Sequence, residues 1–434
     1  MKKLLQYLIT LAMAWLFYTP VFSADLLEVY NNAVRSDPVS IAANLNVLTS
    51  QEVQQQAEAK LYPQASLNGA LSENEMRVSG YDTQRYSGKS AKLNITQVLF
   101  DLQAWRDNIK YKHLIDKTSN DYIQAQSDLI VKVVELYFNV LEAEDALSLS
   151  RKNTQTITKN VEQLKALYER QLVPITGLYE AEARLDLALS TEIEAEAALS
   201  VAYERLYEVI GTRVKKLSPL KEQLKFLPPD DSIEQWVELA LKNNPTLAAN
   251  KSNIEAAKQD VAVKNAGWAP RLSLGFTQSH QDTGYDNAPR PVTDTSTIAL
   301  SFTQPLYLGG GISAQKRESV YRLEIARQVE IETRRKVEQQ LREHYLNLKS
   351  DVLKIKATRR RIESEQKRAE SMRAGFKYGT ATVNNVLDAD TDFLKAQLEH
   401  QKAKYNYIKN QVRLKSAAGT ITESDILELN SWVN

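Results

Sequence analysis

Histidine is the residue type best suited to metal binding and to proton transfer near neutral pH. This chain of 434 residues contains four histidines, which are His113, His280, His344 and His400. At least 56 positions separate any two of them, so none has the short spacing of a metal site or belongs to a catalytic motif. Cysteine is absent, which removes thiolate ligands and a thiol nucleophile. We therefore interpret the histidines as surface or helix-packing residues, and we predict no metal, no cofactor and no enzymatic reaction.

A second candidate for chemistry is the glycine run Gly309-Gly310-Gly311, which precedes a predicted helix. A phosphate-binding loop needs a Lys and a Ser or Thr directly after such a run, and this chain lacks that pair. We interpret the glycines as a turn between a strand and a helix. The chain carries 55 basic and 54 acidic residues, and this balance argues against a nucleic-acid-binding protein.

Residues 1–23 have the pattern of a secretory signal peptide. Lys2 and Lys3 give a charged start, an apolar stretch follows, and Val21 and Ser23 stand at the −3 and −1 positions of a cleavage site. We expect cleavage near Ser23 and a mature chain outside the cytoplasm. No later segment holds 18 apolar residues in a row, so the sequence predicts no transmembrane helix.

The second half of the chain repeats the first after about 207 residues. Asp37-Pro38 returns as Asn244-Pro245, Tyr62-Pro63 returns as Ala269-Pro270, and Gln97-Val98-Leu99-Phe100 returns as Gln304-Pro305-Leu306-Tyr307. A period of this length is too long for a solenoid repeat and indicates that a whole unit of several elements was duplicated. We place the first repeat at residues 24–227 and the second at residues 228–434.

Each half predicts the same order of elements. A helix of about 30 residues comes first, at roughly Leu26 to Leu61 and Ile233 to Trp268, and a proline follows because it cannot continue a helix. Alternating apolar and polar residues on both sides of a turn-rich loop then predict β-hairpins at about 64–100 and 271–307. Two long helices joined by a tight turn complete each half, at about 103–210 and 313–418, and a C-terminal equatorial segment ends the chain.

The predicted strands are about 9 to 12 residues long, which is enough to cross a bilayer when tilted. Four such strands cannot close a barrel, and an open sheet edge in lipid leaves backbone groups unpaired. Closure therefore requires several chains, and three chains would give twelve strands. The sequence thus predicts a mainly α fold with a transmembrane β-barrel contribution.

The duplicated unit, the segment Gln304 to Gly310 and the segment Gly379 to Ala389 make the chain resemble the TolC-like outer membrane efflux proteins. The resemblance covers essentially all of residues 24–429. It implies a homotrimer with a 12-stranded barrel in the outer membrane of a Gram-negative bacterium and a periplasmic α-barrel of long helical hairpins. It also implies export of drugs, toxins or proteins. A periplasmic adaptor (membrane fusion) protein, an inner-membrane pump of ABC or RND type and outer-membrane lipid are the implied partners.

The resemblance places the periplasmic gate at the tips of the long helical hairpins. The family often has two acidic residues at the second tip, and the matching positions are Asn385 and Asp388. Three copies of Asp388 would form an acidic ring that favours cations. Because Ala381 offers no positive charge, we expect no salt bridge to hold this tip closed. The gate then depends on packing by Tyr168 and Phe376 or is looser, and Gly177 and Glu180 are the first-half positions that align with Asn385 and Asp388.

Adaptor docking is predicted at the two tight turns, because exposed apolar residues in a turn indicate a contact surface. The predicted docking residues are Leu172, Val173, Pro174, Gly379, Thr380 and Ala381. Two other readings remain open from the residues alone. A trimeric coiled-coil surface adhesin would carry its hairpins at one end of the sequence, and a periplasmic helical adaptor would lack strands of bilayer length.

Overall fold

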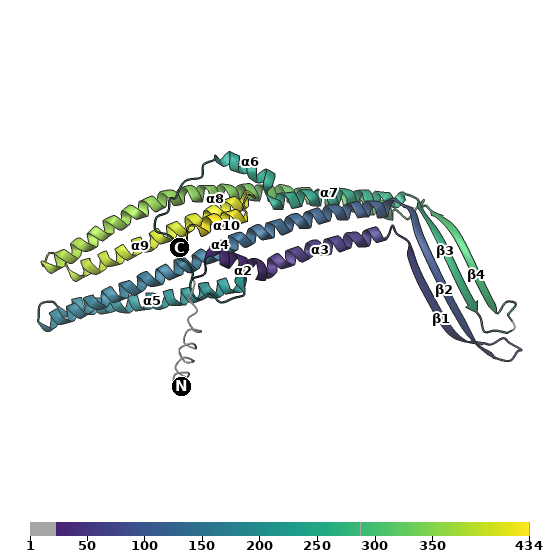
Figure 1. Ribbon diagram of the computed structural model, residues 1–434, viewed down its shortest axis with the longest axis horizontal. Coiled ribbons are helices and arrows are strands. Elements are labelled where there is room, and N and C mark those ends of the chain that lie inside the picture. Colours follow the sequence, from purple (N-terminus) through teal and green to yellow (C-terminus); the bar gives the residue numbers. More distant parts are fainter. Residues whose placement is uncertain (1–22, 287, 434) are drawn as a thin grey trace, which may run out of the picture. The chain divides into compact units, whose positions relative to one another are not determined.

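The computed structural model describes residues 23–286 and 288–433, so the predicted signal peptide lies outside the described residues except for Ser23. The chain is mainly helical and has one four-stranded antiparallel sheet, which confirms the predicted fold class (Figure 1). It divides into two compact units, and each takes segments from both halves of the sequence. Among the described residues, no helix combines the length and the apolar character that crossing a membrane requires. The boundary between the two sequence repeats stays a prediction.

The sheet belongs to the unit formed by residues 42–123 and 245–335. Its strands are β1 (Gln64–Met76), β2 (Gln84–Asp101), β3 (Arg271–Asp282) and β4 (Val292–Thr303), and they lie in the order β1-β2-β3-β4. All three pairings are antiparallel. The loops between β1 and β2 and between β3 and β4 make two hairpins, and β2 joins them by pairing with β3 (Figure 1).

The two faces of the sheet differ in polarity because successive residues of a strand point to opposite sides. One row across the four strands contains Ala65, Ile95, Phe276 and Ile298, and the next row contains Ser66, Asn94, Thr277 and Thr297. Several large apolar side chains of this sheet are exposed, among them Leu67, Leu71 and Phe302. Within the described chain, β1 and β4 each pair on one side only. The sheet therefore presents an uncovered apolar face and two open edges.

The helices that precede the strands are shorter than the sequence pattern suggested. We predicted one helix from Leu26 to Leu61, but the structure has α2 (Leu26–Ser36) and α3 (Pro38–Ala59). Asp37 adopts an extended conformation and its Oδ2 accepts from Ser40 N at 2.8 Å, because Pro38 excludes the helical conformation at the preceding residue. The second half repeats this break between α6 (Ile233–Asn243) and α7 (Pro245–Asn265), and η1 (Ala266–Trp268) follows.

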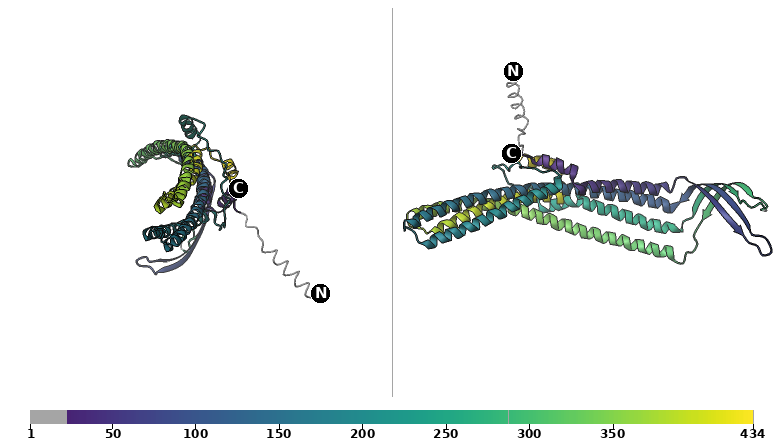
Figure 2. Two further views of the ribbon diagram at one scale, coloured as in Figure 1. Left: turned by 90° about the vertical axis from the view of Figure 1, so that its left-hand side faces the viewer. Right: turned by 90° about the horizontal axis from the view of Figure 1, so that it is seen from below.

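The other unit contains two long helical hairpins and takes in residues 124–244 and 336–434. The first hairpin joins α4 (Leu102–Glu169) to α5 (Ile175–Ile210), and the second joins α8 (Gly311–Lys377) to α9 (Val383–Ala417). The short helix α10 (Glu423–Asn430) follows α9. Inside this unit α9 lies beside α4, because Lys409 donates to Glu142 at 2.9 Å and Tyr405 donates to Asp145 at 2.7 Å. In this part of the unit the helices follow one another as α8, α9, α4 and α5 in a curved row (Figure 2), and nearer the tips α5 also lies against α9.

Candidate gate at the tips of the helical hairpins

Each hairpin ends in a turn whose backbone bonds fix its shape. In the first turn Gln171 has a φ of 59°, and Leu172 N donates to Leu167 O at 2.9 Å. In the second turn Gly379 has a φ of 76°, where glycine avoids the steric cost of a side chain, and Thr380 N donates to Gly375 O at 2.8 Å. Both turns therefore reverse the chain within a few residues and bring four helix ends together.

The two tips contact each other through a buried apolar cluster. Its buried members are Leu164 of α4, Leu178 and Ala181 of α5, and Leu387 of α9. Three half-buried side chains pack against them, namely Val161, Phe376 and Val383. Since the members come from both hairpins, separating the tips would expose apolar surface to water. Apolar packing thus joins the two tips, and Phe376 takes part in it whereas Tyr168 does not belong to the cluster.

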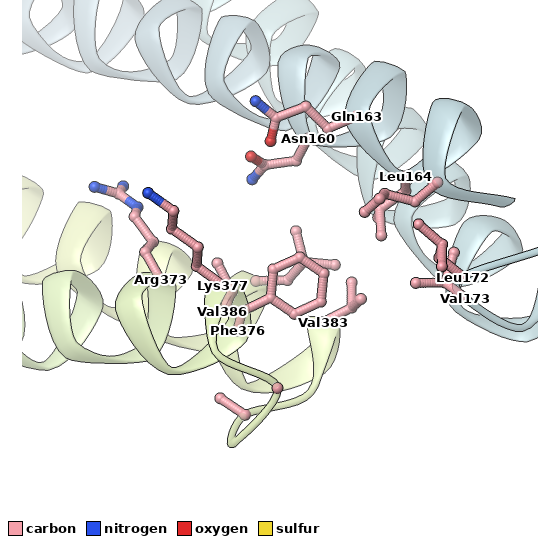
Figure 3. A pocket seen from close by; sticks show the side chains of 14 residues that line it. Asn160, Gln163, Leu164, Leu172, Val173, Arg373, Phe376, Lys377, Val383 and Val386 are labelled. Carbon is pink, nitrogen blue, oxygen red and sulfur yellow. The ribbon is translucent and has the colours of Figure 1, made fainter. Parts of the chain in front are cut away.

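A cavity of about 740 Å³ opens beside this cluster, and its wall comes from both tips (Figure 3). Leu164, Leu172 and Val173 face it from the first hairpin, and Phe376 and Val383 face it from the second. The polar part of the wall consists of Asn160, Gln163, Arg373 and Lys377. The remaining lining residues are Leu167, Gly379, Ala381, Val386 and Leu387. The tips therefore pack together along one side, and on the other side they leave an apolar recess lined also by the basic side chains of Arg373 and Lys377.

An ion pair also joins the two hairpins, and the prediction that this tip lacks a salt bridge was wrong. Arg184 Nη2 of α5 donates to Asp388 Oδ1 of α9 at 2.6 Å. The expectation failed because it considered only Ala381 as the source of a positive charge. The charge comes instead from Arg184, which lies on α5 two helix turns after Gly177. The two side chains are 33% and 51% exposed, so water screens the attraction.

A second acidic residue, Asp390, is buried inside the second hairpin. Arg373 Nη2 of α8 lies 2.8 Å from Asp390 Oδ1, but neither carboxylate oxygen has a well-directed hydrogen bond within the described residues. Burial raises the pKa of Asp390, and the attraction of Arg373 offsets only part of this effect. One helix turn beyond Asp388 on α9, Asp392 accepts from Arg368 at 2.9 Å. The acidic residues of α9 near the gate are therefore each paired with an arginine.

The predicted gate residues do not all lie at the contact between the two hairpins. Asp388 joins the hairpins, and Phe376 lines the cavity. Asn385 is instead part of a capping box, since its backbone N–H donates to Thr382 Oγ1 at 3.3 Å and its Oδ1 accepts from Thr382 N at 3.0 Å. This cap explains why an amide suits the position. The other three gate candidates are near the first tip, where Gly177 and Glu180 are half-buried and Tyr168 is exposed.

The predicted docking residues lie in the two turns. Leu172 is 66% exposed, and Pro174, Gly379 and Thr380 are exposed as well. Val173 and Ala381 are half-buried and face the cavity. Sequence reasoning missed Arg184, Asp390 and Arg373. No local pattern reveals them, because each acts through a partner on another helix.

The histidines stay outside any site of chemistry. Burial lowers the pKa of both His344 and His400, and the ring Nδ1 of His400 lies 3.0 Å from Thr358 Oγ1. In the described part of the chain, no group of three or more His, Asp or Glu side chains is arranged to hold a metal ion. The glycine run Gly309 to Gly311 leads from the sheet into α8. None of these residues adds a second candidate site.

Long helical hairpins that meet at their tips, together with a sheet that has an apolar face and open edges, define the class of outer membrane channels with a helical tunnel. Residues 29–212 and 236–420 match the outer membrane efflux protein family, and the chain belongs to this family. The two matches fall one in each half of the sequence. The family is one of channels and transport proteins rather than enzymes.

Curated relatives extend over nearly the whole chain. Outer membrane protein TolC of Escherichia coli (strain K12) is 28% identical over 443 aligned residues, which cover 99% of this chain and 89% of TolC. The alkaline protease secretion protein AprF of Pseudomonas aeruginosa is 26% identical, with 95% and 90% covered. The crystal structure of the Campylobacter jejuni CmeC outer membrane channel has a TM-score of 0.81 at 16% identity, and the match covers 94% of this chain and 90% of CmeC.

These relatives establish where the chain acts and what kind of protein it is. It is an outer membrane channel of efflux and type I secretion, located in the Gram-negative outer membrane with its tunnel in the periplasm. The predicted family, function and location are confirmed. The surface-adhesin alternative is not favoured.

Proposed function

We propose that three copies of this chain form one exit duct, which takes its energy from a pump in the inner membrane. Channels of this family are trimers that work with adaptor and pump partners. The open edges of β1 and β4 support a trimer, because three four-stranded sheets joined edge to edge make a closed barrel of twelve strands. The apolar row of Ala65, Ile95, Phe276 and Ile298 then faces lipid, and the polar row faces the lumen.

We place the periplasmic gate at the hairpin tips, and the observation that carries this proposal is the contact between the two tips. Leu164, Leu178 and Leu387 pack across it, and the pair of Arg184 and Asp388 bridges it. Opening requires the hairpins to separate, which exposes the apolar cluster and breaks the ion pair. In the closed state Arg184 offsets the charge of Asp388, and in the open state Asp388 is free to attract cations in the lumen. Tyr168, Gly177, Glu180 and Asn385 complete the proposed gate.

The adaptor docks, in this proposal, on the two turns of residues Leu172 to Pro174 and Gly379 to Ala381. The exposure of Leu172 and the apolar recess beside Val173 support this assignment. An ABC-type and an RND-type pump both suit the chain, since the tunnel contacts the pump through the adaptor. AprF is named as an alkaline protease secretion protein and the matching family as outer membrane efflux proteins, so both kinds of export occur among proteins similar to this chain.

Planar bilayer recordings test the gate. The mature wild-type protein is compared with Asp388→Ala and with Arg184→Ala, and conductance and cation selectivity are measured for each. We expect Asp388→Ala to lower cation selectivity and to raise conductance. Arg184→Ala raises both quantities, because it breaks the same ion pair and leaves the carboxylate unpaired. Equal conductance and selectivity in all three proteins would remove Asp388 and Arg184 from the constriction.

A further inference from the structure

One exposed face of α5 is acidic and carries apolar residues at helical spacing. Between Ile175 and Ile210 the helix has eight acidic residues and two basic ones. Asp186, Glu194 and Val201 are exposed on it, and Ile193 is 67% exposed. Exposed apolar side chains that recur on one helix face and are rimmed by polar residues mark an interaction surface, as Ile193 and Val201 do here. We call this face of α5, defined by Asp186, Ile193, Glu194 and Val201, the acidic seam.

The part of α8 within the same unit has the opposite charge. From Lys336 to Lys377 it contains twelve basic and six acidic residues. Leu346, Leu353, Arg360 and Lys367 recur every seven residues, which puts them on one side of the helix, and all four are exposed. Leu353 is 63% exposed. We call this face, defined by these four residues, the basic seam.

Both seams are on the outermost helices of their unit. Where α4 contacts α9, away from the tips, the helices run α8, α9, α4, α5, so α8 and α5 each have one side open (Figure 2). Nearer the tips α5 also packs against α9 through the pair of Arg184 and Asp388. Within the described chain, none of Asp186, Glu194, Arg360 and Lys367 forms an ion pair. The two end faces of the row are therefore unpartnered and of opposite charge.

The charged and apolar residues of the two seams also lie at matching distances from the hairpin tips, which we call their depth. The two helices run in opposite directions, since α5 starts at its tip and α8 ends at its tip. Asp186 is 11 residues from the start of α5 and Lys367 is 10 residues from the end of α8, or about 17 and 15 Å from the tips. Val201 and Leu353 lie 26 and 24 residues from the same ends, or about 39 and 36 Å.

Glu194 and Arg360 also lie at similar distances from the tips, 19 residues from the start of α5 and 17 residues from the end of α8. The tips of the two hairpins are level within one chain, because residues of both turns line the same cavity. Rotational symmetry then keeps the tips level between copies. An α5 helix beside the α8 helix of a neighbouring copy would therefore bring acid against base at two depths, and apolar against apolar at a third.

We propose that the acidic seam of one copy binds the basic seam of the next, and that this charge match selects the neighbour and its register when the helical ring closes. The inference rests on the trimer of the proposed function. A heterologous contact of this kind closes a ring when the rotation between copies permits it. Opposite charges on the two seams also disfavour pairing of a seam with its own kind, because like charges at the same depth repel.

Cysteine cross-linking tests the contact directly, because the chain has no cysteine of its own. The double variant Val201→Cys and Leu353→Cys is purified in detergent and oxidised, and covalent trimers are expected on a denaturing gel. The matched control combines Leu353→Cys with Ser148→Cys, an exposed residue of α4 at a similar distance from the tip. Cross-linking in the control but not in the test pair would overturn the proposal.

A charge swap tests the selection. Asp186→Lys with Glu194→Lys reverses one seam, and Arg360→Glu with Lys367→Glu reverses the other. Each double variant is expected to lower the temperature at which the trimer dissociates, and combining all four is expected to restore it. High salt should shrink these differences, since it screens exposed charges. The control Glu162→Lys with Glu169→Lys makes the same charge change on exposed positions of α4 and should leave the trimer intact.

The outcomes separate the two proposals. If the wild type forms conducting trimers but the reversed variants match the control, the seams are not the contact and the channel proposal stands. If the wild type forms neither trimers nor channels, the proposed function itself fails, and this inference fails with it. Restored stability in the fourfold variant alone supports the charge match, because an overall loss of folding cannot produce recovery.

Discussion

Replacing Leu387 by Ala should open the proposed gate far more than removing its ion pair. Leu387 is 2% exposed and lies in the cluster that joins the two hairpins. The pair of Arg184 and Asp388 is partly solvated, and such pairs contribute about 0.2–1 kcal/mol each. The comparison therefore asks whether packing or charge keeps the tips together.

The expected magnitudes follow from burial and from threefold repetition. Truncation of a buried Leu to Ala costs about 2–5 kcal/mol, and we assign about half of it to contacts that opening removes. Three chains then lose about 3–7.5 kcal/mol of closed-state stability with Leu387→Ala, or at least about a hundredfold in the ratio of open to closed channels. Arg184→Ala removes about 0.5 kcal/mol per chain, which amounts to about tenfold for three chains.

Single-channel recording in planar bilayers measures this ratio as the fraction of time spent at high conductance. Leu348→Ala serves as the control, because Leu348 is 3% exposed in α8 and is remote from the tip. It should destabilise the fold as Leu387→Ala does, without raising the open fraction. A larger open fraction for Arg184→Ala than for Leu387→Ala would refute the reasoning, as would equal effects of the two leucine variants.

Two further predictions concern stability. Gly419 has a φ of 69°, and a Cβ there would overlap the carbonyl oxygen of Asn243, so Gly419→Ala should cost at least about 2 kcal/mol in thermal unfolding. Gly211 has a φ of 66° but no such backbone overlap, so Gly211→Ala should cost about 1–2 kcal/mol. Equal losses of stability in the two variants would contradict this difference. Burial raises the pKa of Asp390, so the folded chain binds a proton there more tightly than the unfolded chain does. Its contribution to stability therefore falls as pH rises from about 4 through the raised pKa, and Asp390→Asn should flatten that decline. A wild-type slope that survives the substitution would assign the decline to other groups.

The sequence predicted the elements better than it predicted the contacts between them. Alternation in β1 to β4 and the long proline-free stretches of α4 and α8 are local signals, which can be recognised in a single sequence. The breaks at Pro38 and Pro245 were missed even though both prolines mark the repeat, because the apolar pattern continues on either side of them.

The site was less predictable for a physical reason. Asp388 was identified by the family resemblance, but its partner Arg184 is 204 positions away and belongs to another hairpin. Nothing in the spacing of either residue records which helix faces it. Asn385 was assigned to the lumen by resemblance, whereas a capping box with Thr382 uses its side chain. Long-range pairing requires the relative rotation of two helices, and helical periodicity alone does not supply it.

The measurement that tests the central claim most directly is the conductance of the purified mature wild-type chain in planar lipid bilayers. A trimeric duct predicts discrete steps of one size per insertion, together with a protein that runs as a trimer in detergent. A chain that inserts no conducting pore and stays in solution as a detergent-free helical protein would contradict the account.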